Sequence, residues 1–248
     1  WNFQVDELSV VFARLEGMPV RLGAVAERMA QGIRTSANEV YVVDLLEDLG
    51  ETVKVQSKQL ATDVVLEKGL LKEFLQGREI KAYQLLPSGK LLILPYIVKK
   101  GCARLVSESE LAQRYPLTYS YLKANKKYLE QREKGRMSGP NWYGYVYPKN
   151  IEVMASSKLL VPDIADRAAF AFDDAGHHAL TSGYAVTLKE SLREKYEYVL
   201  GLLNSKLLSS YLKRISTPVR GGFFRYFTQY IEQLPIRTID FADPADVA

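Results

Sequence analysis

Short blocks of apolar residues, separated by turn formers, recur along most of this chain, and such blocks are typical of strands. Alternating apolar positions run through residues 21–31, and the β-branched and aromatic residues at 40–43 predict another strand. Between them, the loop "GIRTSAN" at 32–38 is rich in turn formers and hydrogen-bonding residues. The apolar run "LLILPYIV" at 91–98 is bounded by turn signals and predicts a buried strand.

Two segments instead have the spacing of helices. Ser107 followed by Glu110 forms a capping-box pattern, Pro116 interrupts the helix that it starts, and a second helix is expected from Leu117 onward. Residues 192–211 then carry apolar side chains every three or four positions. This spacing predicts one long core helix of roughly 20 residues near the C-terminus.

Further short β-prone segments lie between these helices, namely "WYGYVYP", "KLLVPDI", "AFAFDD" and "SGYAVTL". The chain therefore predicts an α+β fold with an irregular, largely antiparallel sheet and a few helices. Gly17 and Pro19 punctuate the start, so we expect a lead-in at 1–19, one domain at 20–240 and a tail at 241–248. Because the chain starts at Trp1, we interpret it as part of a longer polypeptide.

The net charge of +4 is modest, but the charges are unevenly distributed. Residues 99–136 contain ten basic and four acidic side chains, and residues 204–237 contain six basic and one acidic. Two basic segments therefore flank a neutral middle, and a charge run of this kind is usually a solvated helix face. The single cysteine, Cys102, is compatible with a reducing compartment, and the cytoplasm is the expected location. No apolar run reaches the length of a membrane span, so no membrane partner is expected.

The motifs of several enzyme classes are missing from these residues. Neither a P-loop nor a glycine-rich dinucleotide motif is present, and no nucleophile elbow surrounds a serine. "FDDAGHH" at 172–178 contains potential metal ligands, but its residues are also those of an ordinary polar hairpin turn, which is the preferred interpretation. Asp163 lacks the acid-x-lysine partner of a magnesium nuclease. We therefore assign no catalytic residue and no metal ligand.

Several stretches, read together, resemble the TaqI-like C-terminal specificity domain, the target-recognition domain of N6-adenine DNA methyltransferases and of restriction enzymes fused to them. The resembling stretches follow the family's order from about residue 20 to 237: "GIRTSANEVYVV", "FLQGREIKAYQL", "LLILPY", "YPLTYSYLKANKKYLEQRE", Trp142-Tyr143, "KLLVPDI", "AFAFDD", "YVLGLLNSKL" and "IEQLPI". One departure is Ser36, which stands where the family usually has glycine.

This resemblance implies a reader of double-stranded DNA that does no chemistry itself. Its catalytic partner would be an N-terminal methyltransferase domain of the same chain, which binds S-adenosylmethionine, with magnesium as a further candidate if the parent also cleaves DNA. Neither the S-adenosylmethionine loop nor the Asn/Asp-Pro-Pro-Tyr/Phe motif of such a domain occurs here. Three alternatives stay open: half of a type I-like specificity subunit, a protein-interaction module, and a nuclease built around Asp163 and the pair at 173–174.

DNA recognition needs cations and amides for phosphates and hydrogen-bonding side chains for base edges. The loops of this chain supply both kinds. We expect contacts from four clusters: Arg34, Thr35, Ser36 and Asn38 in the first loop; Arg78 and Lys81 after Gly77; Arg132, Lys134 and Arg136 after the second helix; and Arg220, Gly221, Gly222 and Arg225 in "STPVRGGFFRYFTQY". In the last cluster, the glycines allow close approach to a phosphate, and Phe224, Phe227, Tyr230 and Ile231 are expected to anchor the loop in the core. Thr35 and Asn38 have an alternative role, in which they only shape their turn, and Arg78 and Lys81 have surface salt bridging as theirs.

Overall fold

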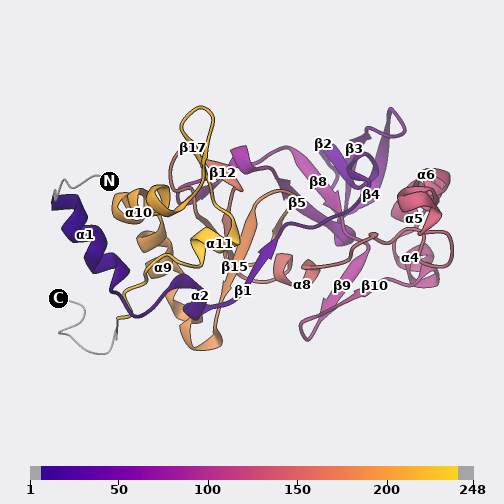
Figure 1. Cartoon of the computed structure of the whole chain (residues 1–248). Coiled ribbons are helices and arrows are strands. Elements are labelled where there is room, and N and C mark those ends of the chain that lie inside the picture. Colours follow the sequence, from indigo (N-terminus) through magenta and orange to yellow (C-terminus); the bar gives the residue numbers. More distant parts are fainter. Residues whose placement is uncertain (1–6, 240–248) are drawn as a thin grey trace.

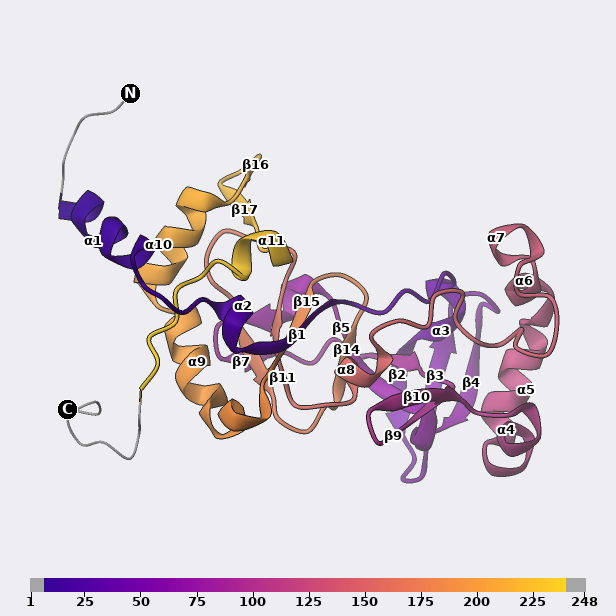
Figure 2. The same cartoon turned by 60° about the horizontal axis from the view of Figure 1, so that its bottom comes forward.

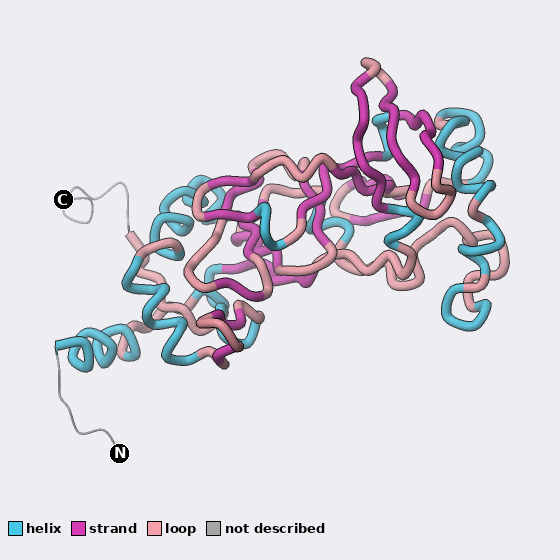
Figure 3. The backbone as a smooth tube through the Cα atoms, turned by 90° about the horizontal axis from the view of Figure 1, so that it is seen from above, coloured by secondary structure: helices cyan, strands magenta, loops and turns pink. Residues whose placement is uncertain are grey.

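Two hydrophobic cores lie along an elongated molecule (Figure 1). The computed structural model describes residues 7–239, so the tail expected at 241–248 lies outside the described residues. We call the part built around Tyr41, Leu92 and Trp142 the sheet lobe, and the part built around Leu22 and Leu212 the helical lobe. Figure 3 shows that helices gather at both ends of the molecule, with strands between them.

The sheet lobe is formed by a six-stranded sheet in the order β14-β5-β8-β2-β3-β4. All its neighbours are antiparallel except β14 and β5. Its strands are β2 (Val42–Asp48), β3 (Thr52–Ser57), β4 (Thr62–Glu67), β5 (Leu71–Leu75), β8 (Lys90–Ile93) and β14 (His178–Leu180). The surrounding elements are α3 (Asn38–Tyr41), η1 (Lys68–Leu70), the β9 (Tyr96–Lys99) and β10 (Cys102–Leu105) hairpin, α4 (Glu108–Arg114), α5 (Pro116–Ala124), α6 (Lys126–Glu130), α7 (Arg132–Gly135) and α8 (Ile151–Met154).

A four-stranded antiparallel sheet separates the two cores, and we call it the dividing sheet. Its order is β1-β15-β11-β13, with β1 (Ala26–Gln31), β11 (Lys158–Val161), β13 (Ala171–Asp173) and β15 (Tyr184–Leu188). Successive residues of a strand point to opposite faces. Leu160 and Ala185 accordingly pack in the core of the sheet lobe, whereas Leu159 and Val186 pack in the other core. This double burial explains the uninterrupted apolar run in "KLLV".

The helical lobe covers the other face of the dividing sheet (Figures 1 and 2). Its helices are α1 (Glu7–Glu16), α2 (Leu22–Val25), η3 (Glu190–Lys195), α9 (Tyr196–Leu203), α10 (Lys206–Ile215) and α11 (Thr228–Ile231). A small three-stranded sheet contains β12 (Ile164–Ala165), β17 (Phe223–Arg225) and β16 (Pro218–Val219), and a short turn contains η2 (Gly77–Glu79), β6 (Ile80–Lys81) and β7 (Gln84–Leu85). None of the helices within residues 7–239 is long and apolar enough to cross a membrane.

These elements confirm the α+β class and the largely antiparallel sheets. The prediction of one continuous long helix near the C-terminus is wrong. The helical segment divides into α9 and α10 because Asn204 and Ser205 have other partners. The Asn204 amide donates to the carbonyl of Phe170 (2.8 Å) and accepts from its N–H (2.9 Å). Ser205 instead caps α10 by accepting from the N–H of Leu208 at 3.1 Å.

In the remaining segments, some of the predicted helices and strands are confirmed and others are wrong. Ser107 caps α4 and Pro116 begins α5, as the sequence predicts. The run at 91–98 forms two strands rather than one, because the chain turns at Leu94 and Pro95. The segment at 40–43 begins inside α3 and only then becomes β2, and "WYGYVYP" forms turns instead of a strand.

Candidate nucleic-acid interface

The loop at 32–38 is tied firmly to the ends of the dividing sheet and β14. The N–H of Gly32 donates to the carbonyl of Gly183 (3.1 Å), and that of Ile33 donates to the carbonyl of Leu180 (2.8 Å). Approach is so close at Gly32 that a Cβ there would lie 2.6 Å from the Leu180 carbonyl oxygen. Glycine is therefore required at this position, and the loop leaves the sheet in a fixed direction.

Thr35 is buried and shapes the loop from inside. Its hydroxyl accepts from the N–H of Ala37 (3.1 Å) and donates to Oδ1 of Asn38 (2.6 Å). The side chains of Arg34, Ser36 and Asn38 are exposed. Ser36 has φ of +56°, which explains why glycine suits this position in the family that the sequence resembles.

Arg132 is buried, so the expectation that it lies free on an exposed loop is wrong. Its guanidinium donates to the carbonyls of Leu129 (2.8 Å), Thr35 (3.2 Å), Trp142 (2.8 Å) and Gly144 (2.8 Å). These bonds use four of the five guanidinium N–H groups. Arg132 therefore joins the first loop to the 142–144 turn and to α6.

The residues after Arg132 return to the surface beside the first loop. Glu133, Lys134 and Arg136 are exposed, and the Arg136 guanidinium lies 5.5 Å from the centre of the Tyr147 ring. Glu133 and Lys134 have φ of +48° and +60°. A hollow of about 580 Å³, which we call the loop hollow, lies between these segments; its lining is residues 33–39, Glu133, Tyr147 and Thr181.

The glycine pair at 221–222 forms the tip of the β16–β17 hairpin, which projects from the helical lobe (Figures 1 and 2). Gly221 and Gly222 have φ of +90° and +81°, and a Cβ on Gly222 would meet no atom within 4 Å. Arg220 is exposed at this tip, whereas Arg225 is half-buried with its guanidinium 5.1 Å from the centre of the Phe227 ring. The hairpin tip thus offers amides and one guanidinium to solvent.

The aromatic anchor of the hairpin differs from the one that spacing predicts. Tyr226 and Ile231 are buried, whereas Phe224 and Phe227 are only half-buried. Tyr226 is held because its N–H donates to the carbonyl of Asp163 at 2.8 Å, at the edge of the small sheet. The extended β17 breaks the helical spacing, so the residue next to Phe227 enters the core.

Arg78 and Lys81 lie at a second hollow, of about 670 Å³, between the 77–82 turn, the 162–169 segment and Phe223 of the hairpin. Both are exposed, and Arg78 forms an ion pair with Glu79 at 2.6 Å. Asp163 and Asp166 also line this hollow, and Asp166 pairs with Arg167 at 3.4 Å. These two cations therefore lie beside β17 of the hairpin, and neither of them lines the loop hollow.

The expected contact residues thus form two groups, one beside the first loop in the sheet lobe and the other at the β16–β17 hairpin and the hollow next to it. In Figure 2, the β16–β17 hairpin and α7 rise on the same side, with the segment from β1 to α3 between them. The first group contains Arg34, Ser36, Asn38, Lys134 and Arg136, and the second contains Arg78, Lys81, Arg220, Gly221, Gly222 and Arg225.

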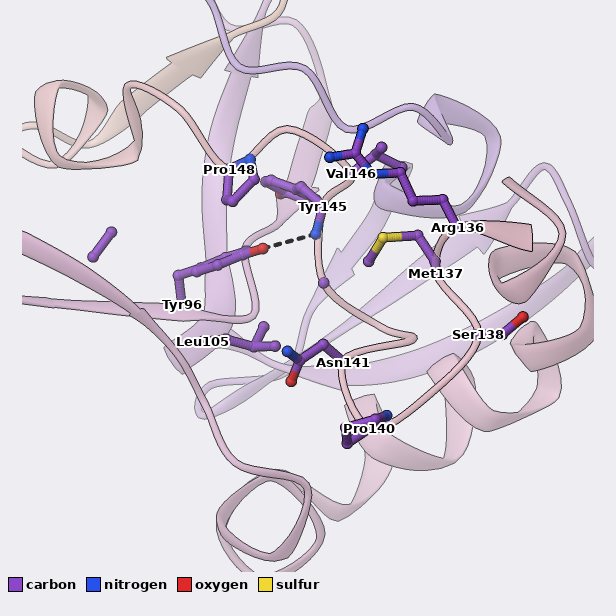
Figure 4. Close-up of a pocket in the computed structure, with 12 residues that line it drawn as sticks. Tyr96, Leu105, Arg136, Met137, Ser138, Pro140, Asn141, Tyr145, Val146 and Pro148 are labelled. Carbon is purple, nitrogen blue, oxygen red and sulfur yellow. Dashed lines mark hydrogen bonds between the residues drawn. The ribbon is translucent and has the colours of Figure 1, made fainter. Parts of the chain in front are cut away.

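Sequence reasoning missed a third hollow, of about 510 Å³, between the β9–β10 hairpin and the 136–148 segment (Figure 4). Tyr96 forms one wall, and its hydroxyl accepts from the N–H of Tyr145 at 2.7 Å. Burial raises the pKa of Tyr96 to about 12, so its hydroxyl stays neutral. Leu105 and Met137 also line this hollow, which has no pattern in the sequence because its walls come from separate segments.

The segment "FDDAGHH" is a turn between two sheets rather than a hairpin, because β13 and β14 belong to different sheets. Asp173 is buried in an ion pair with Lys158, and it accepts from the N–H groups of His177 and His178, both at 3.0 Å. Burial by itself would raise the pKa of Asp173, but the hydrogen bonds from His178 and the charge of Lys158 hold it well below its usual range. No metal-ligand cluster exists within the part of the chain that the structure describes.

Comparison with known proteins relates this architecture to one family. The model of the TaqI-like C-terminal specificity domain matches residues 72–236. The chain is 24% identical to the type II restriction enzyme and methyltransferase RM.Eco57I of Escherichia coli over 96% of its length and 25% of that protein. It is also 24% identical to the type II methyltransferase M.PaeR7I of Pseudomonas aeruginosa, over 98% of the chain and 38% of that protein.

A third relative is the type II methyltransferase M.BanIII of Aneurinibacillus aneurinilyticus, 24% identical over 83% of the chain and 33% of that protein. The chain therefore spans between a quarter and two fifths of the length of these relatives. The matched residues include the small sheet, the hairpin and both α9 and α10. This chain belongs to the family of TaqI-like C-terminal specificity domains.

Proposed function

We propose that this chain recognises a specific sequence in double-stranded DNA, as the target-recognition domain of a type II restriction-modification enzyme or adenine-N6 DNA methyltransferase. In this role, the chain positions DNA for a methyltransferase domain of the same polypeptide. That domain would use S-adenosylmethionine, with magnesium as a further candidate if the parent also cleaves DNA. Family membership together with the placement of exposed basic loops carries the proposal.

The state of the basic side chains supports this role. Within residues 7–239, Arg34, Lys81, Lys134 and Arg220 have no ion-pair partner, and all four are exposed. Unpaired cations on rigidly anchored loops can neutralise phosphates without first breaking an internal salt bridge. A solvated helix face, by contrast, commonly has pairs one turn apart, as Lys126 and Glu130 do at 3.8 Å.

A salt titration tests the proposal directly. If about six cations neutralise phosphates, the slope of log K against log salt should be about −5. The measurement would use fluorescent duplexes selected from a random pool, with both this chain and the full polypeptide that its gene encodes. A slope near zero for both proteins would refute DNA recognition.

Three alternatives predict other outcomes. Half of a type I-like specificity subunit would bind DNA equally well but would lack an Asn-Pro-Pro-Tyr motif upstream in its polypeptide. An interaction module would bind an acidic protein and show no preference among duplexes. A nuclease would nick DNA when metal is added, but the buried pairing of Asp173 with Lys158 argues against that chemistry.

A further inference from the structure

The loop hollow and the hairpin tip differ in the kinds of hydrogen-bonding group that they present. At the hairpin tip, the one side chain that forms hydrogen bonds is that of Arg220, which carries donors alone, and Gly221 and Gly222 add backbone N–H groups with no side chain in front of them. A phosphate accepts hydrogen bonds and donates none, so the tip is complementary to a phosphate. The open space around Gly222 leaves room for the backbone of a strand to approach.

In the loop hollow, donors and acceptors stand together. Arg34 is a donor, and no other side chain among residues 7–239 pairs with its guanidinium. Because Oδ1 of Asn38 already accepts from Thr35, the free amide N–H groups of Asn38 are available for an acceptor. Glu133 lines the same hollow with an exposed carboxylate that has no hydrogen bond or ion pair within the described residues. A carboxylate in this position repels a phosphate but accepts from an amino group.

Only base edges combine acceptors with amino donors in the major groove. Guanine O6 and N7 accept, as does adenine N7, whereas adenine N6 and cytosine N4 donate. Arginine and asparagine are the usual partners of those acceptors, and glutamate is a usual partner of the cytosine amino group. The three unpaired groups of the loop hollow therefore match the mixed pattern of base edges better than the uniform pattern of the DNA backbone.

The backbone around Glu133 holds its side chain at a cost in conformational energy. Glu133 and Lys134 both have left-handed φ values, which are unfavourable for residues other than glycine. Arg132 fixes the chain immediately before them through bonds to four carbonyls. Across the hollow, Ser36 also has a left-handed φ of +56°. Both walls are thus held in unfavourable conformations by the rigid structure behind them, and Arg132 is a positioning residue for both.

We infer that the loop hollow reads bases, with Glu133 accepting a hydrogen bond from the amino group of adenine or cytosine, while the hairpin tip binds a phosphate. This inference rests on the proposed recognition of DNA. It gives the two groups of contact residues different roles. Arg34, Asn38 and Glu133 set the preferred sequence, and Arg220 with the glycine amides sets the affinity for any sequence.

The test compares Glu133→Ala, Glu133→Gln and Arg220→Ala. Each protein is put through selection from random duplexes, and its Kd is then measured for the best duplex and for single base-pair changes. Glu133→Ala should lower discrimination at one base pair by between about fivefold and 150-fold, the range for a specific base contact. Glu133→Gln should keep part of that preference because an acceptor oxygen remains. Neither variant should weaken binding to random duplexes.

Arg220→Ala should instead weaken binding to every duplex by a similar factor and make the salt slope less negative by about 0.9, as loss of one phosphate contact requires. Glu130→Ala is the matched control, because it removes a nearby carboxylate that lies outside the loop hollow. It should leave the base preference unchanged.

The outcomes separate the two proposals. If the unsubstituted protein binds duplexes with the expected salt slope but Glu133→Ala keeps the full base preference, the separation of base reading from phosphate binding is wrong and DNA recognition stands. Equal weakening of all duplexes by Glu133→Ala would also overturn the inference. Absence of salt-dependent binding by the unsubstituted protein would overturn both proposals together.

Discussion

Replacing Arg132 with alanine should destabilise the sheet lobe strongly, although the sequence alone suggests a surface arginine. The change removes a buried guanidinium that donates to four carbonyls, and within residues 7–239 only the Gly144 carbonyl keeps another side-chain donor, the Tyr41 hydroxyl at 3.3 Å. Each hydrogen bond to a charged group contributes about 1.5–3 kcal/mol. Such bonds are not additive, so the total is smaller than their sum, but breaking a buried hydrogen-bond network is among the most destabilising effects of a single substitution. We therefore expect a loss of about 4 kcal/mol in the free energy of unfolding.

Urea denaturation followed by circular dichroism would measure this loss, and thermal unfolding should show a fall of roughly 8–16 °C for a chain of this size. Arg132→Lys should recover only part of the stability, because an ammonium group lacks the planar fork that reaches separate carbonyls. Arg136→Ala is the control: its side chain is exposed and stacked on Tyr147, so it should cost less than about 0.5 kcal/mol. A loss below about 1 kcal/mol for Arg132→Ala would refute this role for the buried guanidinium.

Three other changes test the remaining structure. Tyr226→Ala removes a buried core side chain and should lower the free energy of unfolding, measured with denaturant, by about 3–5 kcal/mol. Arg220→Ala removes an exposed side chain and should change that free energy by less than about 0.5 kcal/mol. Equal losses in the two variants would contradict the separation of anchor and tip. Gly32→Ala should cost about 1–3 kcal/mol by the same measurement, because its Cβ would press on the Leu180 carbonyl, and a neutral result would contradict that close approach. The pKa of Asp173 is lower in the folded protein than in the unfolded chain, so its contribution is present above about pH 4 and is lost as the pH falls below that value. Urea unfolding at a series of pH values from 6 to 2 gives the free energy of unfolding as a function of pH. As the pH falls, this free energy should decrease less in the double variant Lys158→Met/Asp173→Asn than in the unsubstituted protein, and an equal decrease in both would contradict the prediction.

The fold class can be predicted from the sequence because the fold class depends on local patterns, which tertiary contacts seldom override. Ser107 and Pro116 act through their own backbone neighbours, and both behave as predicted. The division between α9 and α10 depends on Phe170, which lies more than 30 residues before Asn204 in the chain. Helical periodicity contains no information about such a partner, and the predicted continuous helix is wrong for that reason.

The same limit applies to the candidate site. Exposed loop residues such as Arg34 and Arg220 could be named from turn formers and charge alone. Arg132 has the same local signals, yet its carbonyl partners lie at positions 35, 142 and 144 as well as at Leu129 in α6. The loop hollow is likewise formed by segments about 100 residues apart in the sequence. Glu133 becomes a candidate contact residue only because the fold places it beside the first loop.

Under the proposed recognition of DNA, the dividing sheet has a consequence for the duplex as well as for the protein. Because its two faces belong to two different cores, a change in the angle between the lobes would expose apolar side chains on both sides at once. The distance between the loop hollow and the hairpin tip is therefore fixed. If both engage one duplex, any mismatch with straight DNA must be absorbed by bending the duplex, at an elastic cost of order 1–6 kcal/mol that depends on base sequence. Flexible steps between the two contact points would then be favoured even where no side chain touches a base.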